Sequence, residues 1–146
     1  LGKNLRELDI NVPLESQKAV FGTAFDPVAL DCAVVELSQS WCPPCRRLIP
    51  HLIALQNKYP NVKIMQISPE PVAKLQGMFA GQTPSYTVSS VTADIWEDFS
   101  RVLGVQGIPH TCIIDKGEIR FSGHPAEPEF EKVLAMMNSK YAPKTE

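Results

Sequence analysis

Two cysteines separated by two prolines are the residues in this sequence best suited to chemistry. Cys42 and Cys45 stand in the run Trp41-Cys42-Pro43-Pro44-Cys45, a CPPC motif between a short apolar segment and an amphipathic one. At the start of a helix, unpaired N–H groups and the positive end of the helix dipole stabilise a negative charge. The position therefore predicts a lowered pKa for Cys42, whose thiolate would be the nucleophile of disulfide exchange.

The second cysteine of the pair is placed to complete such an exchange. Cys45 would lie one turn inside the helix, close enough to attack a mixed disulfide formed at Cys42, so the pair is expected to cycle between dithiol and disulfide. Paired cysteines can also bind zinc, but a second pair, or two histidines at matching spacing, is missing. Packing is the other alternative, and two prolines at a helix start are poor core design. We therefore predict no metal and no cofactor beyond the redox-active disulfide.

The elements that position this pair can be predicted from the spacing of apolar residues. The run Cys32–Leu37 is typical of a strand buried on both faces, and steps of three and four predict a helix over residues 43–58. Pro50 lies inside that helix and is expected to kink it. Alternation over residues 8–14 predicts an edge strand, whereas residues 17–31 contain turn formers. The remaining pattern predicts strands at 62–67, 86–91, 111–114 and 118–122, and helices at 72–79, 95–103 and 130–141.

Strands that alternate with helices predict an α/β fold, with a mixed central sheet covered by helices on both faces. The turn at Lys116-Gly117 predicts a hairpin, and therefore an antiparallel edge. The 146 residues fit one domain. A net charge of −2 argues against nucleic-acid binding through a basic surface. No apolar stretch approaches the roughly 20 residues of a transmembrane helix.

With its cysteine pair between a buried strand and a helix, the sequence resembles the thioredoxin superfamily over roughly residues 33–141. The resemblance implies a three-layer thioredoxin-like fold with an N-terminal extension. Among its members the TlpA/ResA-type oxidoreductases are the most similar, because they share the CPPC centre and a run like Gly107–Asp115 that is followed by a hairpin and Gly123-His124-Pro125. The extra residues near 68–93 fit the insertion that those proteins carry. Tryparedoxin and nucleoredoxin share the WCPPC motif. The run Ser38-Gln39-Ser40 departs from all of these. The motifs that carry the resemblance are Trp41–Cys45, Pro50, Glu36 and Gly107-Ile108-Pro109-His110.

The resemblance also implies roles for residues around the pair. Pro109 would be a cis proline packed against the cysteines, and the backbone of Ile108 would pair with a substrate chain. Glu36 would be a buried acid that takes a proton from Cys45, unless its side chain points to solvent instead. Three further residues, Trp41, Pro43 and Pro44, are expected to contact substrate. His110 would tune the thiolate or contact substrate, or simply end a strand.

These features predict a monomeric protein-disulfide reductase that acts on a disulfide-bearing protein and is regenerated by an upstream thiol reductant. A peroxide-defence protein of the peroxiredoxin type would need Thr or Ser at the position of Gln39. A Sco-like metal carrier, with His110 or His124 as a further ligand, would need a longer cysteine spacing. A non-catalytic interaction module would not need the intact pair.

The other two cysteines, Cys32 and Cys112, are expected to pack in the core, with a regulatory disulfide as the alternative. Unpaired cysteines favour a reducing cytosol, whereas TlpA/ResA-type relatives are exported, so the sequence leaves the compartment open.

Overall fold

The computed structural model describes residues 1–144 and is built on one mixed sheet with the strand order β1-β4-β3-β2-β5-β6. Strands β2, β3 and β4 are mutually parallel, β1 is antiparallel to β4, and β5 is antiparallel to both β2 and β6. This arrangement confirms the predicted α/β class and mixed sheet. The strands are β1 (Gln17–Phe21), β2 (Cys32–Leu37), β3 (Lys63–Ser68), β4 (Thr87–Val91), β5 (His110–Asp115) and β6 (Glu118–Gly123). The helices are the 3-10 turn Leu14–Ser16, α1 (Pro43–Lys58), α2 (Val72–Met78), α3 (Ala93–Val102) and α4 (Pro128–Lys140).

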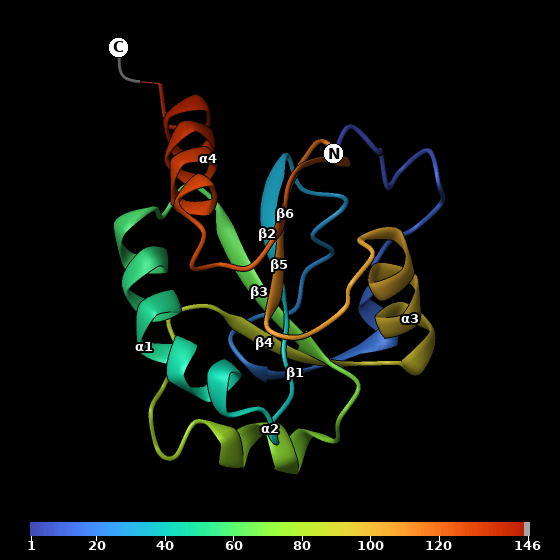
Figure 1. The fold of residues 1–146 in the computed structure, drawn as a ribbon, viewed down its shortest axis with the longest axis vertical. Coiled ribbons are helices and arrows are strands. Elements are labelled where there is room, and N and C mark those ends of the chain that lie inside the picture. The colour runs from blue at the N-terminus through green and yellow to red at the C-terminus, as the bar shows by residue number, and fades with distance from the viewer. Residues whose placement is uncertain (145–146) are drawn as a thin grey trace.

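Helices cover both faces of the sheet, as predicted. Alternate side chains of β2 point to opposite faces, so Val34 joins a core with α1, α2 and α4 while Val35 joins a core with α3. Figure 1 shows α1 and α4 on one side of the sheet and α3 on the other. Because β2 lies inside the sheet under both layers, all six of its residues are buried.

The first strand does not lie where the alternating pattern placed it. Residues 8–14 form no strand: Asp9 has a positive φ of 57°, and the N–H of Ile10 donates to the carbonyl oxygen of Leu5 within a turn. Ile10 and Val12 are nevertheless buried in the α3-side core. The alternation thus reflects burial of an irregular segment. The edge strand is β1, in a region where the sequence indicated only turns.

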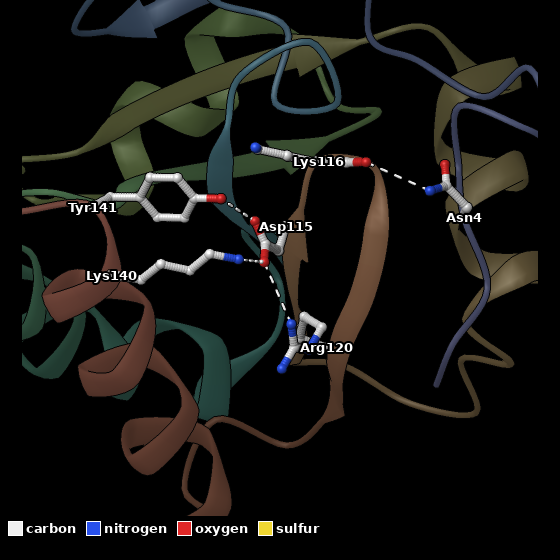
Figure 2. A network of polar contacts seen from close by, with 6 residues as sticks. All are labelled: Asn4, Asp115, Lys116, Arg120, Lys140 and Tyr141. Atoms are coloured by element: carbon white, nitrogen blue, oxygen red, sulfur yellow. Dashed lines mark hydrogen bonds and ion pairs between the residues drawn. The ribbon is translucent and has the colours of Figure 1, made fainter.

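Asp115, the last residue of β5, attaches the C-terminal end of α4 to the sheet. Its carboxylate accepts hydrogen bonds from Lys140 Nζ at 2.6 Å and from Tyr141 Oη, and Arg120 Nη1 lies 3.4 Å away (Figure 2). Burial acts to raise the pKa of Asp115, but these hydrogen bonds and cations together lower it. None of the helices in the described part of the chain has the length and apolar character needed to span a bilayer.

Candidate redox site

The cysteine pair lies where β2 ends and α1 begins. Cys42 is the N-cap residue of α1, and Pro43 and Pro44 occupy its first turn, where a missing N–H breaks no helical hydrogen bond. The Cys42 sulfur accepts a hydrogen bond from the Cys45 backbone N–H at 3.3 Å. Cys42 and Cys45 are joined by a disulfide across a Cα–Cα distance of 5.2 Å. The predicted placement of the pair is therefore observed, and a thiolate at Cys42 would meet both an N–H donor and the helix dipole.

A second segment, before β5, closes against the cysteines. The Ile108–Pro109 peptide bond is cis, as the resemblance implied. The Cys42 sulfur lies 3.7 Å from the carbonyl oxygen of Ile108, although 66 residues separate them in the chain. Ile108 is half-buried and packs against both cores, while Pro109 is buried. The fold thus brings the cis-proline segment directly beside the Cys42 sulfur.

The surface around the disulfide is apolar and open. Trp41 is 64% exposed, and Pro43 and Pro44 are also exposed, whereas Cys42 itself is only 3% exposed. The indole Nε1 of Trp41 donates to the side-chain oxygen of Gln39, two residues earlier in the chain. Such a surface offers contact area to an approaching chain.

Glu36 lies inside the protein and not at a solvent-facing edge. It is 1% exposed, and it shares the α1 side of β2 with Val34. Thr111 is its register neighbour on the adjacent strand β5, and the Thr111 hydroxyl donates to Glu36 Oε1 at 2.6 Å. Glu36 Oε2 has no hydrogen-bond partner among the described residues. Burial raises the pKa of Glu36 to about 8, against the opposing effect of the Thr111 hydrogen bond. A carboxyl with this pKa is mostly protonated at neutral pH.

The surroundings of Glu36 continue as a buried polar row across the sheet. Gln66 is its register neighbour on β3, and the Tyr86 hydroxyl lies 3.5 Å from Gln66 Oε1. Burial raises the pKa of Tyr86, and the negative charge of Glu36 adds to this effect. All three side chains are almost fully buried, so solvent offers little screening to the charge of an ionised Glu36.

His110 points away from this row. Along β5 its side chain points to the face opposite that of Thr111 and to the same face as Cys112, which belongs to the α3-side core. Its Nε2 lies 2.9 Å from Ser122 Oγ on β6. Burial lowers the pKa of His110. A role for His110 in the redox site stays a prediction.

The two remaining cysteines are buried on opposite sides of the sheet. Cys32 belongs to the core under α1 and Cys112 to the core under α3. Burial raises the pKa of both thiols to about 12, with Asp115 adding to the effect at Cys32. This environment is that expected for packing residues. Within residues 1–144, no group of three or more His, Cys, Asp or Glu side chains is arranged to hold a metal ion.

Sequence reasoning missed one group of contacts, at the loop before Cys42. The carboxylate of Glu70 accepts a hydrogen bond from the Ser40 backbone N–H and another from Ser40 Oγ, both at 2.6 Å. On the other side, Arg46 Nη1 donates to the Ser40 carbonyl oxygen at 2.6 Å. The only signal in the sequence was the unusual run Ser38-Gln39-Ser40, which gave no indication of Glu70.

Residues 16–80, which include the cysteine pair, match the family model Thioredoxin. Human thioredoxin is 34% identical over 50 residues, which cover 34% of this chain and 48% of that protein. A thioredoxin-like protein of Acanthamoeba polyphaga mimivirus is 32% identical over 50 residues, covering 34% of this chain and 36% of its own length. The matches therefore span about half or less of these curated relatives.

Solved structures agree with the fold over most of the chain. A thiol:disulfide interchange protein of the thioredoxin family from Chlorobium tepidum superposes with a TM-score of 0.64 at 22% identity, covering 88% of this chain and 96% of its own. A thiol:disulfide interchange protein from a Bacteroides species gives a TM-score of 0.65 at 15% identity, covering 94% of this chain and 88% of its own. The chain has the thioredoxin fold, and the disulfide at its active-site position supports a redox function.

Proposed function

Because the chain folds as thioredoxins do and carries a disulfide at the start of α1, we propose that it is a protein-disulfide oxidoreductase that works as a reductase. The observation that carries this proposal is the Cys42–Cys45 pair, with Cys42 as N-cap and its sulfur beside Ile108. The pair itself is the redox group, and the proposed reaction draws on no metal or other cofactor.

The reaction is two thiolate exchanges. The Cys42 thiolate attacks one sulfur of a substrate disulfide, which forms a mixed disulfide and releases one substrate thiolate that takes up a proton. The Cys45 thiol then loses its proton and attacks the Cys42 sulfur, which forms the Cys42–Cys45 disulfide and releases the second substrate thiol. Two electrons and two protons pass to the substrate. A dithiol reductant restores the pair by the same exchanges in reverse.

Glu36 is the proposed proton acceptor in the second exchange. Its raised pKa of about 8 lies close to that of a cysteine thiol, which favours proton transfer in both directions. The fraction of Glu36 that is ionised at neutral pH is the form that accepts the Cys45 proton. Its Oε2 has no other partner in the described structure and is therefore free to take a proton, directly or through a water. Glu36 lies on the same side of the sheet as the helix that carries Cys45.

The proposed substrate is an extended segment of a disulfide-bearing protein. Backbone groups of Ile108 would pair with it by strand addition, which places a substrate sulfur next to Cys42. The exposed ring of Trp41 and the two prolines would contact its side chains. This mode of recognition reads backbone geometry and the disulfide more than sequence.

Reduction of insulin disulfides tests the proposal, with dithiothreitol as the electron source. The protein is expected to accelerate precipitation of the insulin B chain at least tenfold over dithiothreitol alone. Cys42→Ser removes the nucleophile and should abolish the acceleration, whereas Cys112→Ser changes a cysteine outside the pair and should retain it. Equal rates with and without the wild-type protein would reject the reductase activity.

A further inference from the structure

Ser40, two positions before Cys42, is hydrogen-bonded to an acidic side chain and to a basic one. Glu70 accepts both the N–H and the hydroxyl of Ser40, and Arg46 donates to the Ser40 carbonyl oxygen. The backbone of Ser40 is therefore fixed at its donor and at its acceptor by two opposite charges. The adjacent turn, in which the Cys42 N–H donates to the Gln39 carbonyl oxygen at 3.2 Å, transmits this position to the reactive cysteine.

Glu70 is itself fixed by the strands on which the loop rests. Ser68 Oγ at the end of β3 donates to Glu70 Oε1 at 3.1 Å and accepts the Glu70 N–H at 3.2 Å. Ser90 Oγ on β4 donates to the Glu70 carbonyl oxygen at 2.6 Å. Glu70 lies two residues before the start of α2, whose Leu75 lies in the same core as Cys45 of α1. The segment between β3 and β4 thus reaches the redox site through this carboxylate.

We propose that Glu70 is a positioning residue that, paired against Arg46, sets the dithiol–disulfide equilibrium of Cys42 and Cys45. The inference rests on the proposed redox function and adds the group that tunes it. Glu70 acts through Ser40 and through its charge, and it takes no part in the exchange itself.

The two charged groups act on that equilibrium in opposite directions. A negative charge near the start of α1 disfavours a thiolate at Cys42, whereas the guanidinium of Arg46 favours it. Because a stabilised thiolate stabilises the reduced form, loss of the Glu70 charge shifts the pair toward the dithiol. Loss of the Arg46 charge shifts it toward the disulfide. A role limited to holding the fold together predicts no such opposition.

The test equilibrates the protein with glutathione at pH 7, where the protein disulfide and two glutathione molecules form the protein dithiol and one glutathione disulfide. Alkylation and intact mass give the reduced fraction. Glu70→Gln is expected to raise the reduction equilibrium constant at least twofold, about 9 mV for this two-electron couple, and Arg46→Gln to lower it at least twofold. Glu97→Gln, an exposed change of the same charge on α3, is the matched control and should leave the constant unchanged.

Thermal unfolding establishes that each variant is folded. If Glu70→Gln does not fold, Ser40→Ala provides the test. It removes one hydrogen-bond donor to the Glu70 carboxylate but keeps the negative charge, which is then less well neutralised. The reduction equilibrium constant should therefore fall at least twofold. Shifts below twofold relative to Glu97→Gln, or shifts of both charge variants in the same direction, overturn the inference while leaving the proposed function intact. A wild-type pair that does not exchange with glutathione at all rejects the proposed function, and this inference with it.

Discussion

Replacing Glu36 with glutamine should change how the stability of the protein depends on pH. The carboxyl is 1% exposed, and burial raises its pKa from 4.5 to about 8. Below pH 4.5 it is protonated in both the folded and the unfolded chain. Between pH 4.5 and 8 the unfolded chain releases this proton while the folded protein retains it, so the free energy of unfolding falls as pH rises. Above pH 8 both states are ionised and the dependence ends.

The size of the effect follows from the two pKa values. At about 1.4 kcal/mol for each pKa unit, the difference between 4.5 and about 8 corresponds to about 5 kcal/mol. This is a large share of the 5–15 kcal/mol typical of a domain. Glutamine does not ionise, so in the Glu36→Gln variant this position causes no decrease in the free energy of unfolding as pH rises. Its amide still offers an oxygen to the Thr111 hydroxyl, while its NH₂ takes the place of the unpartnered Oε2.

Urea unfolding of the oxidised protein at several pH values between 4 and 9 measures this difference. The stability of Glu36→Gln relative to wild type should rise by about 5 kcal/mol across that range. The unpartnered amide adds an offset that does not vary with pH, so the slope is the diagnostic quantity. Glu97→Gln, at an exposed site, should run parallel to wild type. If the Glu36→Gln curve also runs parallel to wild type between pH 4.5 and 8, the reasoning about burial is refuted.

Two further predictions concern the cysteines. Cys45→Ser should trap mixed disulfides through Cys42 when a disulfide-bearing protein is added, detected as dithiothreitol-sensitive adducts by mass spectrometry; adducts that persist when Cys42 is also mutated would contradict the assigned order of attack. After mild reduction, iodoacetamide at pH 7 should alkylate Cys42 at least a hundredfold faster than Cys112, because burial raises the pKa of Cys112 to about 12 and denies the reagent access. Comparable rates at the two sites would rule out thiolate stabilisation at the helix start.

Local sequence rules placed the cysteine pair correctly. The apolar run Cys32–Leu37 and the helical spacing after Cys42 reflect burial and periodicity, which depend on neighbouring residues. Two prolines suit the first turn of a helix for a local reason as well. The same rules failed for residues 8–14, because alternate burial of Ile10 and Val12 also arises in an irregular segment packed against a core.

Local sequence rules could not predict which face of the sheet each strand residue points to. Period two showed that Glu36 and Val35 face opposite ways, but not which of them faces α1. That choice depends on how the helices connect across the sheet. It is this choice that puts Glu36 on the same side as Cys45 and His110 on the other, with Ser122.

The sequence by itself determined the chemistry available to this protein: a thiol pair at a helix start, which needs only residues three apart in the chain. Tertiary structure decided what surrounds that pair. Ile108 reaches Cys42 from 66 residues away, and Glu70 reaches Ser40 from 30 residues away, because strands distant in the chain are neighbours in the sheet. Contacts of that kind leave no periodic signal in a sequence, since they depend on strand order and register and not on local spacing.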